Sequence, residues 1–371
     1  MKILHICGDY DVFHRNLVVE QNQIGHNTRI FYYTTRNKRN ITIDKDSLDF
    51  YNSKIRLLRG PVFFRTRIQH VANAFINYYK DCHDFELIHA HMWFSDGELA
   101  YEAKKKWGIP YIIAIRNTDI YSWYYWRIPW NKKRGLEIIK NASKIIFLSS
   151  TYKKQLIDLI PISISKDIIM KCEIVPNGID DFWHKNSSIK HREKPGKIIR
   201  ILTVGNIEVN KNQITVLKAI EKLVSVGYNV EYYIVGNILD KKIGKRLVSS
   251  KYSKLIGFRS KEELINIYKK SDIFVMPSIH ETFGLVYVEA MSQGLPVIYS
   301  KGQGFDGQFD DGEVGYSVDS KNYIDIYNKI LKILDDYENI SSSCIQASKQ
   351  FKWKTIAEHY QDIYEKVLTL G

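Results

Sequence analysis

The sequence contains two glutamates eight residues apart, Glu281 and Glu289, whose carboxylates could take part in binding or catalysis. The apolar run at 272–276 predicts a buried strand before them, and apolar residues at helical spacing from Phe283 onward predict a helix. Along a helix, eight residues span about 12 Å, whereas the two carboxyl groups of a sugar hydrolase lie roughly 5–10 Å apart. We therefore expect the two carboxylates to hold different parts of one long ligand.

The chemistry of this turn fits a ligand with a diphosphate between two sugars. The first free N–H groups of a helix bind anions, and Gly284 lets a ligand approach the backbone closely. A carboxylate repels phosphate but accepts hydrogen bonds from sugar hydroxyls. These preferences together describe a nucleotide-diphosphate sugar. The alternative is that Glu289 is a solvated helix residue and that Glu281 only favours the helix dipole.

The segment 278–291 resembles the signature E-x-F-G-x-x-x-x-E-A-M of the family-4 glycosyltransferases. The resemblance implies an α/β fold of the GT-B type, in which two Rossmann-like doubly wound domains face a central cleft. It implies retaining transfer of a sugar from a UDP- or GDP-linked donor to a hydroxyl acceptor, with no cofactor and no metal. Glu281 would orient the donor sugar and Glu289 the ribose. A sugar phosphorylase, a nucleotide-sugar epimerase and a non-catalytic nucleotide-sugar-binding subunit are the alternatives.

Other strand ends in the second half of the sequence resemble the donor site of this family. The segment 204–213 resembles the motif V-G-R-L-x-x-x-K-N-Q, which implies that Lys211 lies against the diphosphate. Asn206 replaces the arginine of that motif, and the turn at 256–260 resembles the G-F-V-S turn beside the nucleobase. The donor-binding candidates are Gly205, Asn206, Lys211, Gly236, Gly257, Phe258, Thr282, Phe283, Gly284, Leu285 and Glu289.

The strand predicted at 86–91 ends in His89-Ala90-His91, which resembles the H-A-H strand end of the family. The resemblance implies that His91 contacts the hydroxyls or the developing charge of the transferred sugar. The catalytic candidates are therefore His91, Glu281 and Lys211. His89 and His91 share one face of the strand, but the sequence places no third ligand with them, and we expect no metal site.

The acceptor-side candidates follow other strands of the first half. Gly8 and Asp9 stand where the family has a Gly-Gly loop that approaches the diphosphate. The segment 116–119 stands where the family commonly has H-G-x-D, and Ser149 matches the serine of its V-S-E strand end. These candidates are Gly8, Asp9, Arg116, Asn117, Thr118, Asp119 and Ser149.

Strands and helices alternate twice along the chain, and 371 residues exceed what one hydrophobic core usually serves. We expect an acceptor-side domain at 1–185, a polar linker at 186–198 and a nucleotide-sugar-binding domain at 199–350. The last segment, 351–371, predicts an amphipathic helix that resembles the family's terminal F-x-W helix, which crosses back to the first domain.

Charge is distributed unevenly between the two halves. Residues 1–200 hold 33 Lys and Arg against 20 Asp and Glu, whereas residues 201–371 hold 21 of each. The basic first half predicts an anionic partner. The aromatic and basic segment 121–134 suits either the membrane interface or stacking on a sugar acceptor, and its alternative is a packed aromatic corner.

Neither the cysteines nor the hydropathy indicates an exported or membrane-spanning protein. The four cysteines are scattered without a Cys-x-x-Cys pair, and no apolar run approaches 18 residues. We expect a cytoplasmic protein, in peripheral contact with the inner face of the membrane, that binds no nucleic acid. Its acceptor is then a saccharide or lipid-linked saccharide of bacterial surface polysaccharide synthesis, which the resemblance and the basic first half favour.

Overall fold

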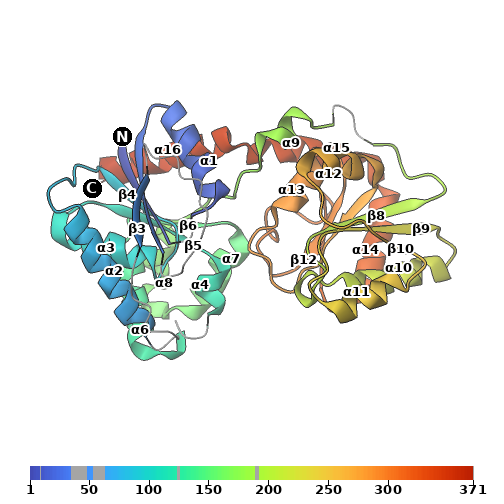
Figure 1. The fold of residues 1–371 in the computed structure, drawn as a ribbon, viewed down its shortest axis with the longest axis horizontal. Helices are drawn as coiled ribbons and strands as arrows, with labels where there is room; N and C mark the ends of the chain where they lie inside the picture. Colours follow the sequence, from blue (N-terminus) through green and yellow to red (C-terminus); the bar gives the residue numbers. More distant parts are fainter. Residues whose placement is uncertain (9, 35–47, 53–62, 123–125, 189–191, 371) are drawn as a thin grey trace. The chain divides into compact units, whose positions relative to one another are not determined.

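The computed structural model describes residues 1–8, 10–34, 48–52, 63–122, 126–188 and 192–370 (Figure 1). The chain divides into two compact units, Met1–Asn177 with Trp353–Gly371, and Gly178–Lys352. Each unit contains one parallel β-sheet with helices between its strands. This arrangement confirms the predicted α/β class with two doubly wound sheets.

The first unit is built on a seven-stranded sheet of order β3-β2-β1-β4-β5-β6-β7. Its strands are β1 (Lys2–Cys7), β2 (Asn27–Thr34), β3 (Leu48–Asn52), β4 (Leu87–Ala90), β5 (Tyr111–Ile115), β6 (Lys144–Phe147) and β7 (Cys172–Ile174). Its helices are α1 (Val12–Gln23), α2 (Phe64–Tyr78), α3 (Asp96–Trp107), α4 (Asn117–Tyr121), α6 (Pro129–Asn141), α7 (Ser150–Leu159), α8 (Ile162–Lys171) and α16 (Trp353–Leu370). The near-continuous apolar runs of the central strands are typical of parallel strands buried on both faces.

Two apolar clusters fill the two faces of this sheet. Leu4 belongs to the cluster that includes residues of α2 and α3, whereas Ile3 belongs to the cluster that includes residues of α1 and α16. Alternate residues of a strand point to opposite faces. His5 therefore shares the face of Ile3, beneath α1 and α16.

The C-terminal helix α16 packs on the first unit through one apolar stripe. Ile356, Tyr360, Tyr364 and Val367 recur at helical spacing, and all four are buried. Gln21 of α1 donates a hydrogen bond from Nε2 to the Tyr364 hydroxyl at 2.8 Å. The end of the chain is thus part of the same core as the first strand.

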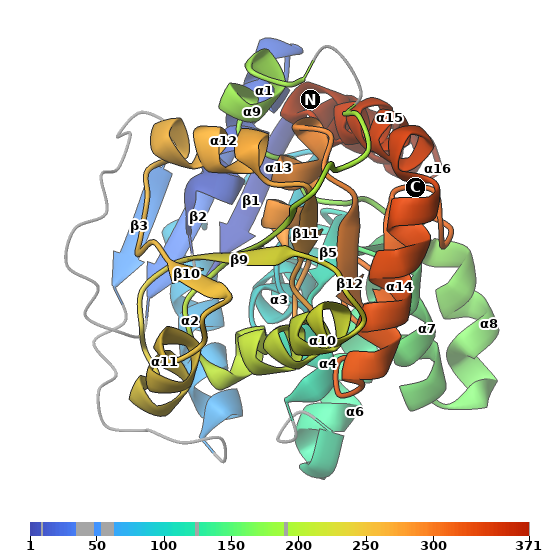
Figure 2. The same cartoon turned by 90° about the vertical axis from the view of Figure 1, so that its right-hand side faces the viewer.

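The second unit is built on a six-stranded sheet of order β10-β9-β8-β11-β12-β13 (Figure 2). Its strands are β8 (Ile199–Val204), β9 (Val230–Val235), β10 (Ser253–Leu255), β11 (Ile273–Val275), β12 (Val297–Ser300) and β13 (Gly315–Val318). Its helices are α9 (Asp181–Lys185), η1 (Val209–Lys211), α10 (Gln213–Ser225), α11 (Lys241–Val248), α12 (Lys261–Lys270), α13 (Leu285–Ser292), α14 (Tyr323–Asp335), α15 (Tyr337–Ser348) and η2 (Lys349–Phe351). Every strand pairs in parallel with its neighbours, so the carboxyl ends of all six lie at one edge.

The residues predicted to be a linker, 186–198, belong to the second unit. The guanidinium of Arg192 donates hydrogen bonds to the backbone oxygens of Gln293 at 2.8 Å and Tyr268 at 2.9 Å. These bonds fix Arg192 to this unit. The chain passes between the units at Asn177–Gly178 and again at Lys352–Trp353.

Candidate functional site

An ion pair between Lys211 and Glu281 lies at the carboxyl edge of the second sheet. Lys211 ends η1 after β8, and Glu281 lies in the loop between β11 and α13. The Lys211 Nζ and the Glu281 Oε2 are 2.7 Å apart, although 70 positions separate the two residues. Ser278 donates a hydrogen bond from Oγ to the same oxygen at 3.2 Å. The structure thus brings together two of the three catalytic candidates.

Both members of this pair remain accessible. The Lys211 side chain is 20% exposed and the Glu281 side chain 13%. Such partial burial strengthens an ion pair relative to one in bulk water, yet leaves both groups within reach of a ligand. In the absence of ligand, each charge neutralises the other.

The turn that follows Glu281 requires glycine at position 284. Gly284 is the N-cap of α13 with φ of 82°, a left-handed conformation. A Cβ at this position would lie 2.3 Å from the Tyr287 ring. The helix therefore begins at Leu285, two residues later than the sequence pattern indicates. Phe283 is only 2% exposed and packs against Phe305, so its side chain belongs to the core.

Three glycines among the donor-binding candidates end adjacent strands. Gly236 follows β9 and donates its N–H to the oxygen of Gly257 after β10. A Cβ on Gly236 would lie 2.2 Å from the oxygen of Gly205, and a Cβ on Gly205 would contact the Lys211 stem. A side chain larger than hydrogen therefore cannot be accommodated at Gly236. Backbone groups therefore line this part of the edge.

The exposure and the contacts of three further donor-binding candidates differ. Phe258 is 68% exposed. Asn206 is exposed, and its backbone oxygen accepts a hydrogen bond from Gln213 Nε2 at 2.9 Å. Thr282 is half-buried, and its backbone oxygen would lie 1.8 Å from a Cβ on Gly304.

Glu289 lies inside α13 and is half-buried. The hydroxyl of Tyr268 donates a hydrogen bond to Glu289 Oε2 at 3.2 Å. Burial raises the pKa of Glu289 from its ordinary value of 4.5 to about 7. A solvated helix glutamate would show neither feature, so the alternative expectation for Glu289 is wrong. Near neutral pH this carboxyl group can both accept and donate hydrogen bonds.

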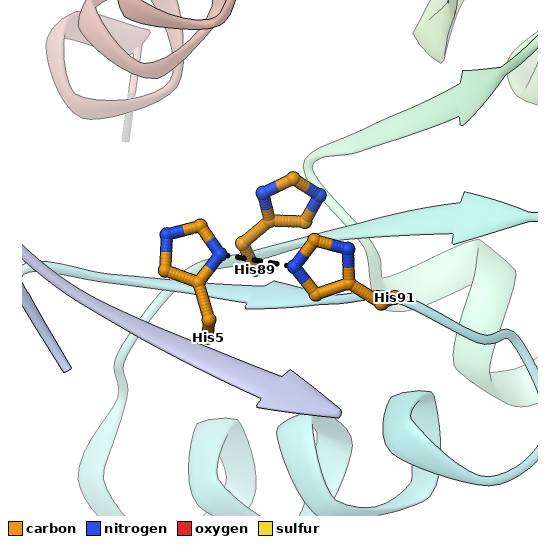
Figure 3. Close-up of side chains that lie close together, drawn as sticks. All are labelled: His5, His89 and His91. Carbon is orange, nitrogen blue, oxygen red and sulfur yellow. Dashed lines mark hydrogen bonds between the residues drawn. The ribbon is translucent and has the colours of Figure 1, made fainter. Parts of the chain in front are cut away.

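Histidines from two neighbouring strands form a buried cluster in the first unit (Figure 3). His91 follows β4 directly, and its Nε2 lies 2.9 Å from Nδ1 of His5 on β1. His5 and His89 face each other in the strand register. Burial lowers the pKa of His5 to about 3 and those of His89 and His91 well below their ordinary value. The expectation that no third ligand lies beside His89 and His91 is therefore wrong.

The position of His5 could have been inferred only from the pairing of β1 with β4. Both strands are apolar runs, and a histidine within such a run reads as a satisfied polar residue. Contact of His91 with a transferred sugar stays a prediction.

The acceptor-side candidates mainly shape the local backbone. Asp119 Oδ2 accepts hydrogen bonds from the backbone N–H groups of Arg116 at 3.0 Å and Trp93 at 3.3 Å. Burial raises the pKa of Asp119 to about 6. Ser149 caps α7 by accepting the N–H of Tyr152 at 3.3 Å. Both residues thus have structural partners in the first unit.

The remaining acceptor-side candidates lie near these two. Asn117 is buried at the start of α4 and accepts the N–H of Thr118, an exposed residue, at 2.8 Å. The Arg116 guanidinium lies 5.2 Å from the centre of the Phe13 ring. A Cβ on Gly8 would lie 2.8 Å from the Tyr33 hydroxyl, so a larger residue there would require the Tyr33 side chain to shift. Asp9 lies outside the described residues.

Asp96 is a candidate functional residue that the sequence analysis did not indicate. It begins α3, is fully buried, and accepts a hydrogen bond from the Tyr33 hydroxyl at 2.7 Å. Burial raises its pKa to about 8. Its position after β4, near Gly8, is the one signal that could have drawn attention to it.

The described part of segment 121–134 is packed at one end and exposed at the other. Trp126 packs edge-on against Trp93, and its Nε1 donates a hydrogen bond to the backbone oxygen of Asp119 at 3.1 Å. Arg134 forms ion pairs with Glu98 and two other glutamates. Trp130 is 47% exposed. The packed aromatic corner is therefore correct for Trp126, and Arg134 is not a free cation.

No helix in the described ranges has the length and apolar content that crossing a membrane requires.

Comparisons with known proteins identify relatives of both units. Residues 12–181 match the family described as Glycosyltransferase Family 4, and residues 184–351 match the family described as Glycosyl transferases group 1. A D-inositol 3-phosphate glycosyltransferase of Corynebacterium kroppenstedtii is 23% identical, over 98% of this chain and 86% of the relative. An uncharacterised glycosyltransferase of Methanocaldococcus jannaschii is 26% identical, over 79% of this chain and 80% of the relative.

Solved structures share the whole fold. The apo form of the lipopolysaccharide outer core galactosyltransferase WaaB superposes with a TM-score of 0.73 at 17% identity, covering 99% of this chain and all of that one. HepE of Anabaena, in complex with UDP and glucose, superposes with a TM-score of 0.67 at 16% identity, with the same coverage.

Proposed function

We infer substrates and a mechanism from the family of this chain, which belongs to the glycosyltransferases of group 1 and family 4 and has their α/β GT-B fold. It is a glycosyltransferase, as are its named relatives. The donor that we propose is a nucleotide-diphosphate sugar, linked to UDP or GDP. The related HepE was solved with UDP and glucose, which supports this choice.

The observation that carries the donor proposal is the pair formed by Lys211 and Glu281 beside the start of α13. A diphosphate bears more negative charge than a carboxylate and is a stronger partner for the Lys211 ammonium. When the diphosphate takes Lys211, the Glu281 carboxylate is released to accept hydrogen bonds from sugar hydroxyls. Before a donor binds, the pair thus neutralises a carboxylate that lies close to the phosphate site.

The other donor contacts follow from the positions of the remaining candidates. The exposed Phe258 ring offers a stacking surface for a nucleobase. The glycine strand ends at 205, 236 and 257 let the nucleotide approach the backbone. The carboxyl group of Glu289 would bind the ribose hydroxyls.

In the mechanism that we propose, the chain stabilises charge on the leaving diphosphate through Lys211 and the N–H groups at the start of α13. Glu281 orients the donor sugar. Transfer retains the anomeric configuration and needs no metal. Among the described residues that we assign to the donor, none is placed as a covalent nucleophile.

The acceptor that we propose is a hydroxyl of a saccharide or a lipid-linked saccharide in bacterial surface polysaccharide synthesis. The basic first half of the chain suits an anionic acceptor or an anionic membrane. The related WaaB is by its name a lipopolysaccharide galactosyltransferase, which supports this class. The exposed Trp130 and Lys133 would then lie at the inner face of the membrane.

A screen of nucleotide sugars tests the proposal. Wild-type protein is incubated with each UDP- and GDP-linked sugar plus saccharide acceptors, phosphate or water, and released nucleotide and sugar products are measured. We expect nucleotide diphosphate release that depends on an acceptor. Release that requires phosphate would indicate a phosphorylase, and a changed sugar without release would indicate an epimerase.

A control variant shows whether a loss of transfer in Lys211→Ala comes from the donor site or from the removal of any lysine of this unit. Lys254→Ala removes a lysine of the same unit that pairs with Glu231 at 2.5 Å on the sheet. It should transfer sugar as the wild type does. Lys211→Ala should not, and equal activity of the two variants would overturn the proposed donor site.

A further inference from the structure

Three histidines meet in the core of the first unit. His5 lies on β1, directly opposite His89 on β4 in the strand register, and His91 lies two residues further along. Their side chains project from the two strands toward one another (Figure 3). One nitrogen of each ring lies within 4.8 Å of one nitrogen of each of the other two. They are 0%, 0% and 2% exposed, respectively.

The hydrogen bonds of this cluster leave nitrogens without partners. His5 Nδ1 and His91 Nε2 share one hydrogen bond of 2.9 Å, and His89 Nδ1 is bonded to the Tyr364 hydroxyl at 2.8 Å. His5 Nε2, His89 Nε2 and His91 Nδ1 have no hydrogen-bond partner among the described residues. Buried polar atoms in folded proteins are nearly always partnered, so three such atoms in one cluster indicate a missing partner.

We propose that His5, His89 and His91 form a binding site for a divalent transition-metal ion of the zinc class. Neutral imidazole is a preferred ligand of zinc, cobalt, nickel and copper, and three histidines form the complete protein ligand set of some zinc sites. The neutral form of imidazole is the one that coordinates metal.

The surroundings of the cluster supply further features of a metal site. The bond from His89 to Tyr364 resembles the outer partner that typically fixes the ring of a ligating histidine. Cys7 and His14 offer ligand atoms within 4.8 Å of one nitrogen of His91. Cys7 and His14 thus form a second group with His91, separate from the three histidines. The ion would have three protein ligands, His5, His89 and His91, as some zinc sites do.

Cobalt absorption tests this site without any sugar substrate. The full chain is stripped of metal with a chelator and titrated with Co²⁺, and the visible d–d bands of tetrahedral cobalt are recorded. We expect about one equivalent of Co²⁺ to bind. Zn²⁺ should displace the cobalt. A folded wild-type protein that develops no tetrahedral d–d bands would overturn the proposal.

Histidine variants locate the site. His5→Gln and His89→Gln should each weaken Co²⁺ binding by at least about tenfold. Loss of a residue that only supports a metal ligand already weakens metal binding by about that factor, and loss of a ligand should weaken it at least as much. The control His83→Gln removes an exposed histidine that stacks on Trp107, and it should bind as the wild type does. Unchanged binding in folded His5→Gln and His89→Gln, or weakened binding in His83→Gln, would show that cobalt binds elsewhere.

If the histidine variants do not fold, the thermal stability of the wild type tests the metal site. Zn²⁺ should raise the Tm of the wild type, whereas Mg²⁺, which prefers oxygen ligands, should leave it unchanged. No effect of saturating Zn²⁺ on Tm would contradict a site in the core. Because no donor or acceptor takes part, this outcome is independent of the proposed transfer reaction.

Discussion

Replacement of Lys211 by alanine gives two separate effects that the structure allows us to estimate. The first is on stability, because the change leaves the Glu281 carboxylate without its cation. Exposed pairs contribute about 0–1 kcal/mol, and breaking a buried pair costs about 3–5 kcal/mol. With side chains 20% and 13% exposed and Ser278 still donating to Glu281, we expect a loss of about 1–2 kcal/mol. For a unit of this size that corresponds to a Tm lower by about 2–8 °C.

The second effect is on transfer. A hydrogen bond to a charged group contributes about 1.5–3 kcal/mol. Loss of such a bond between Lys211 and the diphosphate should therefore lower kcat/KM by about 10- to 150-fold. Steady-state assays at a temperature well below the Tm of the variant measure this loss. The control Lys254→Ala, which breaks an exposed ion pair of the same unit, should change kcat/KM by less than about twofold.

A double-mutant cycle with Glu281→Gln separates a direct role of Lys211 from one exerted through Glu281. If Lys211 binds the diphosphate itself, Lys211→Ala should lower kcat/KM further in the Glu281→Gln background. If Lys211 only holds Glu281 in place, the second change should have no effect. That second result, or full activity of Lys211→Ala alone, would refute the reasoning.

Three other predictions follow from single features of the structure. Because the folded-state pKa of Glu289 is raised to about 7, ionising it opposes folding, so its contribution to stability falls as pH rises from 4.5 through 7. Nucleotide affinity should rise over pH 6–8, about one unit either side of that pKa, as the carboxylate forms. Glu289→Gln should remove both dependences, measured by calorimetry and urea unfolding; a pH profile equal to that of the wild type would contradict this role. Gly284→Ala should lower stability by about 1–3 kcal/mol more than Gly227→Ala does. Both glycines have positive φ, but only at Gly284 would the Cβ overlap a neighbouring side chain; equal losses in urea unfolding would rule out that overlap. Charge reversal at Lys132 and Lys133 should lower sedimentation with anionic vesicles or raise the acceptor KM, and no change in either would show that this segment contacts neither partner.

The sequence was sufficient to predict the two sheets because their strands are short apolar runs followed by turn residues. The strands predicted at 86–91 and 272–276 agree with β4 and β11 to within one residue at each end. No strand was predicted at β3, whose sequence, Leu48–Asn52, is a short mixture of apolar and polar residues inside a polar region. Local pattern indicates a buried strand well and a short edge strand poorly.

Features that depend on contacts between distant residues were not predictable from local pattern. Arg192, within the stretch expected to be a linker, donates hydrogen bonds to backbone oxygens about 75 to 100 positions away, which no local pattern indicates. His5 joins His89 and His91 only through strand pairing. The proximity of Lys211 and Glu281 was expected from the family resemblance alone, because nothing in their spacing indicates it.

The claim on which this account depends is that the second unit binds a nucleotide-diphosphate sugar beside Lys211 and Glu281. Calorimetric titration of the wild type with UDP, GDP and their common sugar conjugates tests it most directly. We predict saturable binding of one nucleotide family, weakened in Lys211→Ala and unchanged in Lys254→Ala. Absence of heat with every nucleotide and conjugate, or equal affinity in both variants, would contradict the account.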